Sequence, residues 1–325
     1  VRLYQEAAEQ GNAAAQKALG DCYYNGDGVK KVKYDALKCY QKAADQGNAD
    51  AQYMLGECYY NGEGVKKSYE EAINWYERAI VGGNLDAQER LAAVEYDLGK
   101  CYYNGNGVPQ DYTKAVELYQ KAAALGDAGA QCDLGFCYCN GLGITENKMI
   151  GVELYKKSAN QGIPTAQHNL GHCYQYGNGI KKDLIEAVKW YQKASDQGKS
   201  GAQCNLGYCY EYGEGVEKNL KKAFEYYQKA ADAGNATAQC NLGLCYECGN
   251  GVSEDKKKAF ECYQKAANQG MARGQYLLGK CYNDGNGVDV SINRAIEWYQ
   301  KAAEHGSKEA AEKLVILGIK NEVVN

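Results

Sequence analysis

Residues 202–234 read AQCNLGYCYEYGEGVEKNLKKAFEYYQKAADAG, and this stretch determines the fold. Numbered from Ala202 as position 1, positions 1, 5, 8 and 9 are apolar or aromatic and fall on one face of a helix. Gly213 and Gly215 then end this helix, because glycine adopts the positive φ of a helix C-cap at little cost. A second apolar stripe at helical spacing follows over residues 220–233 and ends at another glycine. The stretch therefore predicts a helix, a turn and a second helix.

The same pattern recurs along the whole chain. The dipeptide Leu-Gly is followed each time by x-Cys-Tyr and then by Gly-x-Gly-Val or Gly-x-Gly-Ile. The glycines of this dipeptide are Gly20, Gly56, Gly99, Gly135, Gly171, Gly207, Gly243 and Gly279. Eight units fit between about Ala13 and Gly306, with a half unit before them (Leu3–Gly11) and another after them (Glu309–Leu317). Two short helices cannot bury their apolar faces alone, so we expect stacked units to form one cooperative body.

The motif Ala-x3-Leu-Gly-x2-Tyr-x2-Gly-x-Gly-Val, followed by Ala-x2-Trp/Tyr-Tyr-x-Lys-Ala-Ala-x2-Gly, resembles the Sel-1-like repeat (SLR), a relative of the tetratricopeptide repeats. The resemblance implies an all-α, right-handed α/α superhelix (solenoid) of about eight 36-residue helix-turn-helix repeats plus half repeats at both ends. It also implies that the first helix of each pair lines the concave side. Members of this family act as adaptors that hold protein complexes together, and the resemblance implies no shared catalytic residue.

We expect the solenoid to span residues 1–317 and a C-terminal tail to span residues 318–325. Val315 stands where the repeat has its Leu-Gly glycine, and no Cys-Tyr follows it, so we expect the stack to stop there. The chain opens in the middle of a repeat, at Val1 rather than at a methionine, and we interpret it as a fragment of a longer protein.

The third repeat departs from the period, because seven residues are added within Leu85–Ala93. Seven residues are close to two helical turns, so the apolar face stays nearly in register. We therefore expect a longer first helix that projects past its neighbours. A tolerated insertion and a functional lip on the groove are both compatible with this pattern.

Charge and hydropathy exclude several classes of partner. The chain has 325 residues and a net charge of -4, which offers no basic footprint for nucleic acid and no polybasic signal for a membrane surface. No apolar run approaches the length of a membrane span. We expect a protein partner, and neither nucleic acid, membrane insertion, a cofactor nor a small-molecule substrate.

Eight of the 15 cysteines share position 8 of the first helix, on its core face. A thiol there behaves as a small buried hydrophobe. Stacked helices lie about 8–10 Å apart, whereas a disulfide needs Cα atoms closer than about 7 Å, so we expect no disulfides along this column. Cysteine-rich relatives that do carry disulfides have cysteines where this chain has residues such as Ala123 and Ser195. An odd number of unpaired thiols favours a reducing compartment, and we expect a cytoplasmic location.

Two histidines raise the question of a metal site. His168 and His172 lie four residues apart on one helical face, as two metal ligands would, and Cys132 and Cys204 are equivalent to His168 in the adjoining repeats. A zinc site needs a third and a fourth ligand at about 2.0–2.3 Å, and neighbouring helices place these side chains too far apart to assume that. We favour solvent-facing histidines on a binding surface over a metal site.

The first-helix face opposite the core carries positions 3, 7 and 10, whose identity the core does not dictate. This stripe is rich in Tyr, Phe, Leu, His and Cys, whereas a solvated helix face is mostly charged. Exposed apolar patches mark interaction sites, and tyrosine is enriched at binding hot spots. We predict a groove centred on Phe136, His172, Tyr208 and Leu244. The full set of predicted partner-binding residues is Tyr53, Tyr60, Tyr96, Tyr103, Phe136, His168, His172, Tyr208, Leu244 and Tyr276.

These observations predict a non-catalytic scaffold or adaptor that binds a peptide or a helix in the concave groove. Two alternatives stay open. The repeats belong to the regulatory part of a larger signalling protein such as a kinase, or the chain is a hydrolase like some β-lactam-associated relatives. Against the hydrolase, we find no nucleophile with an adjacent base, and we expect no catalytic residue.

Overall fold

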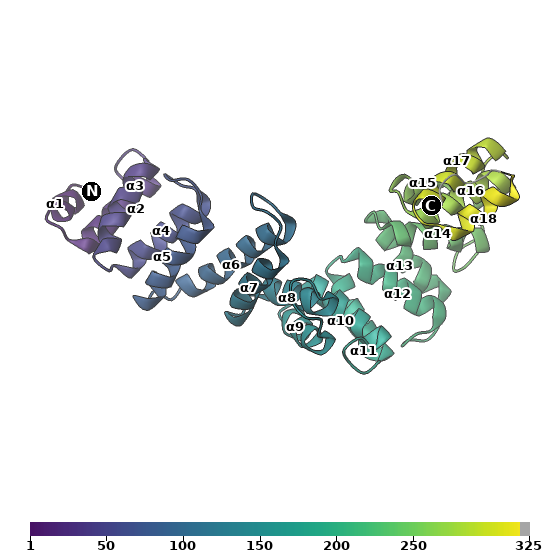
Figure 1. Cartoon of the computed structure of the whole chain (residues 1–325), viewed down its shortest axis with the longest axis horizontal. Helices are drawn as coiled ribbons and strands as arrows, with labels where there is room; N and C mark the ends of the chain where they lie inside the picture. The colour runs from purple at the N-terminus through teal and green to yellow at the C-terminus, as the bar shows by residue number, and fades with distance from the viewer. Residues whose placement is uncertain (319–325) are drawn as a thin grey trace. The chain divides into compact units, whose positions relative to one another are not determined.

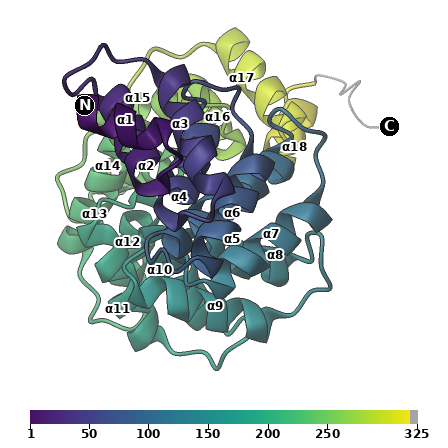
Figure 2. The ribbon, with the colours of Figure 1, turned by 90° about the vertical axis from the view of Figure 1, so that its left-hand side faces the viewer.

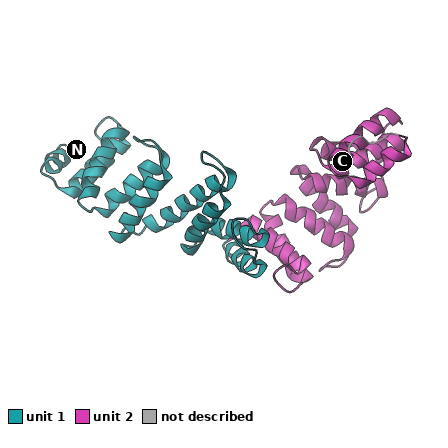
Figure 3. Cartoon of the chain, viewed as in Figure 1, with its two compact units in different colours: residues 1–161 teal, residues 162–325 magenta. Residues whose placement is uncertain are grey.

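The structure is a computed structural model that describes residues 1–318, and these residues form helices and no strands (Figure 1). The chain divides into two compact units, Val1–Gln161 and Gly162–Asn325 (Figure 3). Within each unit the helices stack in chain order, and each helix packs on its neighbours in sequence (Figures 1 and 2). The predicted tail, residues 318–325, lies outside the described residues except for Gly318.

Unit 1 begins with a lone second helix and continues with four helix pairs. Its helices are α1 (Arg2–Glu9), α2 (Ala13–Asn25), α3 (Lys33–Asp45), α4 (Ala49–Asn61), α5 (Tyr69–Val81), α6 (Ala87–Asn104), α7 (Tyr112–Ala124), α8 (Ala128–Asn140) and α9 (Lys148–Asn160).

Unit 2 contains four helix pairs followed by a lone first helix. Its helices are α10 (Pro164–Tyr176), α11 (Leu184–Asp196), α12 (Ser200–Tyr212), α13 (Leu220–Asp232), α14 (Ala236–Cys248), α15 (Lys256–Asn268), α16 (Ala272–Asp284), α17 (Ile292–Glu304) and α18 (Lys308–Ile316). The predicted order of eight pairs with a half repeat at each end is confirmed.

Glycine ends each of the eight paired first helices, as predicted. The residue after α12 is Gly213, which has a φ of 74° and donates its backbone N–H to the Cys209 carbonyl. The second glycine of the same turn, Gly215, also has a φ of 74°, and a Cβ there would overlap the Leu184 carbonyl oxygen of the preceding repeat. The Gly-x-Gly turn therefore caps one helix and packs closely against the start of another.

A contact between glycine and tyrosine joins the two helices of each repeat. A Cβ built on Gly207 of α12 would lie 2.5 Å from Cδ1 of Tyr227, a fully buried side chain of α13. The other Leu-Gly glycines meet a tyrosine ring of their own second helix in the same way. The eight buried tyrosines that make this contact are Tyr40, Tyr76, Tyr119, Tyr155, Tyr191, Tyr227, Tyr263 and Tyr299. The absent Cβ is what lets the ring lie flat against the first helix.

This contact gives a stability prediction with a control in the same helix. Gly207→Ala should destabilise the protein by about 2 kcal/mol, because overpacking of about 3 kcal/mol outweighs the helix propensity gained, about 1 kcal/mol. Gly201→Ala should cost much less, since a Cβ there approaches the His168 ring at 3.1 Å, whereas a Cβ on Gly207 would lie 2.5 Å from the Tyr227 ring. Urea denaturation followed by circular dichroism measures both, and equal stability of the two variants would contradict this account.

Glutamine at position 2 of the first helix joins successive repeats. Its amide donates to a carbonyl near the end of the preceding second helix, as Gln52 Nε2 does to Ala44 O at 3.2 Å. In several repeats its oxygen also accepts a hydrogen bond from a glutamine at the end of its own second helix, as in Gln269 to Gln239 at 2.9 Å. Both capacities of the buried amide are then used, as buried polar groups require.

Repeat three has Glu95 at this position. Glu95 is buried, and its Oε2 has no hydrogen-bond partner among the described residues. Burial, with a smaller contribution from Glu77, raises the pKa of this carboxyl to about 7, and the charge of Lys121 opposes this rise. A carboxylate cannot donate a hydrogen bond as the glutamine amide does, so the charged form is disfavoured in the folded chain.

Stability should therefore depend on pH through Glu95. Its folded pKa lies above the unfolded value, so stability falls as pH rises through the window from about 4.5 to about 7. Glu95→Gln should gain roughly 2–4 kcal/mol at pH 8 and little at pH 4.5. Glu89→Gln, which removes an exposed charge from the same helix, should show no such pH-dependent gain. Thermal unfolding of both variants across this pH range checks the prediction, and parallel curves would refute it.

The inserted residues lengthen the first helix of repeat three, as predicted. α6 has 18 residues, whereas the other seven paired first helices have 13. The extra turn carries Arg90, whose Nη2 donates to Glu57 Oε2 at 2.8 Å and whose Nε donates to Glu57 Oε1 at 2.5 Å. The added turn therefore reaches back onto the first helix of the preceding repeat.

The position-8 cysteines pack in the core, as predicted. Seven of them are buried and Cys101 is half-buried. All 15 cysteines are thiols rather than halves of disulfides. No helix within residues 1–318 combines the length and the apolar character needed to cross a membrane.

Candidate functional site on the first helices of unit 2

The buried face of the first helix is wider than the sequence analysis predicted. On α12 the buried residues occupy positions 1, 3, 5, 6 and 8. Position 6 is buried because the glycine there packs against the tyrosine of its own second helix. The exposed stripe is consequently rotated around the helix. It is centred on positions 7 and 11 rather than on positions 3, 7 and 10.

Position 3 is not solvent-facing, which corrects the prediction for its residues. Cys132, Cys204 and Cys240 are buried. The aromatic residues at this position are half-buried, and each ring lies 5.8 Å from the buried tyrosine of its own repeat, measured between centroids. These four residues are Tyr53, Tyr96, His168 and Tyr276. They contribute packing between the two helices, so they offer a partner little free surface.

Position 10 also makes contacts within the chain in unit 1. Tyr60 donates its hydroxyl to Asp97 Oδ2 of the next repeat at 2.6 Å, and burial together with this hydrogen bond raises the pKa of Tyr60 to about 12. Tyr103 packs edge-on against Tyr112, with ring centroids 5.2 Å apart. Both predicted residues are half-buried.

The four position-7 residues predicted to form the centre of the groove are exposed or half-buried. Phe136 is 41% exposed and Tyr208 is 38% exposed, His172 is exposed, and Leu244 is half-buried. Phe136 lies on α8 of unit 1, whereas the other three lie on successive first helices of unit 2, namely α10, α12 and α14.

Sequence reasoning missed position 11. Tyr176 is 59% exposed and Tyr212 is 60% exposed. The rings of Tyr176 and His172 lie 4.5 Å apart, and so do the rings of Tyr212 and Tyr208. Two successive first helices therefore each present an exposed aromatic pair. The signal in the sequence was the glycine at position 6, since a buried glycine rotates the exposed stripe toward position 11.

The buried tyrosines explain why position 7 is available in unit 2. In unit 1, Tyr40 and Tyr76 donate their hydroxyls to carboxylates at position 7, Asp21 at 2.9 Å and Glu57 at 2.6 Å. In three repeats of unit 2 the acceptor lies at position 10 instead, as in the hydrogen bond from Tyr227 to Glu211 at 2.7 Å, whereas the Tyr299 hydroxyl has no partner among the described residues. In those repeats the side chain at position 7 does not accept a hydrogen bond from the buried tyrosine.

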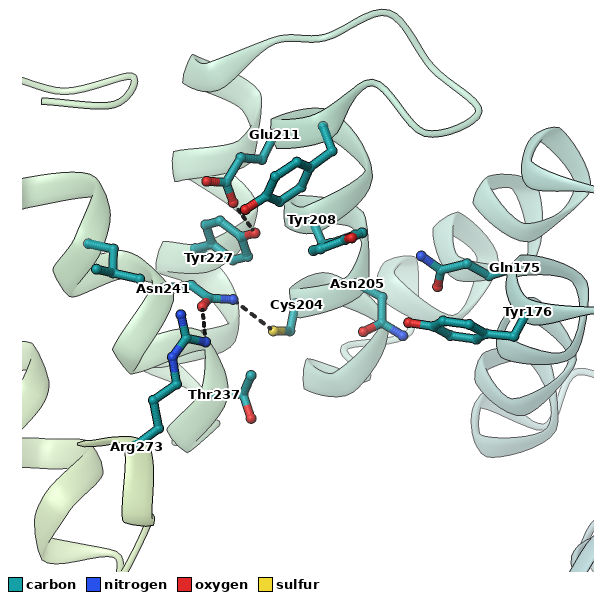
Figure 4. Close-up of a pocket in the computed structure, with 12 residues that line it drawn as sticks. Gln175, Tyr176, Cys204, Asn205, Tyr208, Glu211, Tyr227, Thr237, Asn241 and Arg273 are labelled. Atoms are coloured by element: carbon teal, nitrogen blue, oxygen red, sulfur yellow. Dashed lines mark hydrogen bonds between the residues drawn. The ribbon is translucent and has the colours of Figure 1, made fainter. Parts of the chain in front are cut away.

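A hollow of about 230 Å³ lies between the first helices of unit 2 (Figure 4). Its lining residues are Gln175, Tyr176, Cys204, Asn205, Tyr208, Glu211, Tyr212, Tyr227, Thr237, Asn241, Leu244 and Arg273. Arg273 Nη1 donates to Asn241 Oδ1 at 3.1 Å, and Asn241 Nδ2 makes a long contact of 3.9 Å with Cys204 Sγ. Burial raises the pKa of the Cys204 thiol to about 11, which makes it a poor nucleophile.

The two histidines of α10 have different surroundings. His168 Nε2 lies 3.1 Å from Asn205 Nδ2, and burial lowers the pKa of His168 to about 4, so its ring is neutral near pH 7. His172 is exposed, although partial burial of its ring also lowers its pKa. Across residues 1–318, no three His, Cys, Asp or Glu side chains are grouped so that they would hold a metal ion.

The chain resembles known repeat proteins along nearly its whole length. The profile of the Sel1 repeat matches residues 1–12, 13–48, 49–84, 92–127, 128–163, 164–199, 200–235, 236–271 and 272–307. The unmatched gap between residues 84 and 92 falls on the insertion of repeat three. No curated protein matches the chain.

Two solved structures share both the fold and about a third of the sequence. The protein c5321, a protective antigen of uropathogenic Escherichia coli strains with an SLR fold, is 33% identical, with a TM-score of 0.75 over 99% of this chain and 68% of its own. A Sel1 repeat protein from Oxalobacter formigenes is 31% identical, with a TM-score of 0.71 over 97% of this chain and 89% of its own. The α/α solenoid inferred from the repeats is thereby confirmed, and the chain belongs to the Sel1 repeat family.

Proposed function

We propose that this chain is a non-catalytic scaffold that binds a protein partner across the exposed face of the first helices of unit 2. The partner docks as a peptide or as a helix. The thiol state of the 15 cysteines favours a reducing compartment, so we place this scaffold in the cytoplasm.

One observation carries the proposal, namely the two exposed aromatic pairs on α10 and α12. A tyrosine that packs a core or bonds a neighbouring repeat is explained by the fold. Tyr176, Tyr208 and Tyr212 are exposed instead, and they border a hollow. Exposed tyrosines that gather around a concave site supply large contact area with little loss of side-chain entropy on binding.

The hydrolase alternative has no comparable support. Ser253 and Lys256 match the spacing of a Ser-x-x-Lys motif, but both side chains are exposed, and Ser253 lies in the turn before α15. Lys256 Nζ is 3.9 Å from Glu254 Oε1. A serine nucleophile needs a base within hydrogen-bond reach and a site that excludes water, and no such arrangement surrounds Ser253 in the described residues.

Charge placed on the exposed aromatic pair of α12 tests the scaffold function. Tyr208→Glu/Tyr212→Glu should reduce recovery of the partner from a lysate of the source cells by about thirtyfold or more, since a single hot-spot tyrosine is worth about 2 kcal/mol. Quantitative mass spectrometry of crosslinked pull-downs measures this, after circular dichroism has shown that the variant folds.

The matched control is Ile185→Glu/Val290→Glu. These two apolar side chains are each 61% exposed and lie in unit 2 outside its first helices. The control should recover the same partners as the wild type. If the Tyr208→Glu/Tyr212→Glu variant recovers them equally well, the proposed face is wrong.

A further inference from the structure

Arg273 is an unusual residue at its place in the repeat. It lies one residue before position 1 of α16, where the other paired first helices of unit 2 carry Thr165, Gly201 and Thr237. Its guanidinium lies against Asn241 at the edge of the hollow (Figure 4). None of the ion pairs within residues 1–318 includes Arg273, so its charge has no protein carboxylate as a counterion.

The hollow otherwise contains one charged group, the carboxylate of Glu211. Glu211 Oε2 accepts the hydroxyl of Tyr227, so it already has a structural role in closing the repeat. The Arg273 guanidinium has no carboxylate partner within residues 1–318, whereas the Glu211 carboxylate already accepts a hydrogen bond. Charge complementarity therefore favours an occupant that brings a carboxylate to Arg273, because guanidinium binds carboxylates in a fork-like geometry.

The size of the first hollow favours side chains over a whole cofactor or metabolite, whereas the second hollow described below falls within the range of small-molecule pockets. Pockets for drug-sized ligands measure about 300–1,000 Å³, and this one measures about 230 Å³. Arg273 also lines a second hollow, of about 360 Å³, together with Tyr276, Ser307 and Glu309. Because hollows lie on both sides of Arg273, an occupant is able to continue past it. The carboxylate is then an internal Asp or Glu side chain rather than a chain terminus.

The polar lining favours an extended segment over a helix. A helix that docks in a groove satisfies its own backbone and needs an apolar surface, whereas an extended segment needs partners for its N–H and C=O groups. Asn205 and Asn241 occupy the same position on successive first helices and both line the hollow (Figure 4). Neighbouring helices lie about 8–10 Å apart, which corresponds to about three residues of extended chain.

We propose that the two hollows on either side of Arg273, together the Arg273 groove, bind an extended segment of a partner protein. An internal Asp or Glu of that segment pairs with Arg273, and a neighbouring aromatic or aliphatic residue packs against Tyr208 and Leu244. This inference rests on the proposed scaffold function and specifies the class of partner.

Selection from a library of random 12-residue peptides tests the charge preference directly. The wild-type chain should enrich peptides with Asp or Glu beside an aromatic or aliphatic residue. Arg273→Gln should lose the acidic preference, and Arg273→Glu should replace it with Lys or Arg. The control Arg294→Glu makes the same charge change on the exposed surface of α17 and should keep the wild-type preference.

Fluorescence anisotropy then measures the contact itself. A selected peptide and its Asp→Asn or Glu→Gln counterpart should differ about two- to fivefold in Kd for the wild type, as expected of an ion pair at an exposed arginine. For Arg273→Gln the ratio of the two Kd values should fall to about one, because the acidic side chain of the peptide no longer has a charged partner to lose. An unchanged ratio would overturn the inference.

The outcomes separate this inference from the proposed function. If the wild type enriches peptides without an acidic preference, or enriches amphipathic helix-forming peptides, the Arg273 inference is wrong and the scaffold function stands. If it enriches none, and Tyr208→Glu/Tyr212→Glu recovers the same cellular partners as the wild type, both are wrong.

Discussion

The structure depends on the contact between a glycine and a buried tyrosine in each repeat. A ring such as that of Tyr227 fills the space that a Cβ on Gly207 would take, so a larger residue at Gly207 would push the two helices apart. The ring is also long enough to carry its hydroxyl across the first helix toward that helix's exposed side. There the hydroxyl needs an acceptor, because a buried hydroxyl without a hydrogen bond costs about 1–3 kcal/mol. One packing contact therefore favours a polar residue on the exposed side of the first helix, although the Tyr299 hydroxyl has no such partner among the described residues.

The location of this acceptor decides where a binding surface is able to form. Asp21 and Glu57 are acceptors at position 7, the centre of the exposed stripe. Each holds the tyrosine hydroxyl of its own repeat, so it is not free to contact a partner. Glu57 has a further partner in unit 1, since Arg90 of the lengthened α6 also binds it. When the acceptor stands at position 10, as Glu211 does, position 7 is released, and Tyr208 occupies it. The exposed aromatic pairs of unit 2 follow from this release.

The sequence predicts the repeat, its helices and its cap glycines almost completely, because these depend on local patterns that recur eight times. The lengthened α6 is also predictable, since seven residues preserve the phase of a helix. The binding face is predicted less well. A helical wheel that treats the core as one-sided places Cys204 and His168 on the surface and overlooks Tyr176 and Tyr212. The missing information is the two-sided burial of the first helix, which arises from the tyrosine contact and from stacked neighbours, and no single repeat reveals it.

The same contact explains how the stack differs at α18. This helix packs Ala310 and Leu314 into the core of unit 2 as an ordinary first helix does. Its position 6, however, is Val315, which is 65% exposed. Val315 carries a Cβ at the position where the tyrosine contact over Gly207 leaves no room for one, so α18 lacks the glycine on which that contact depends.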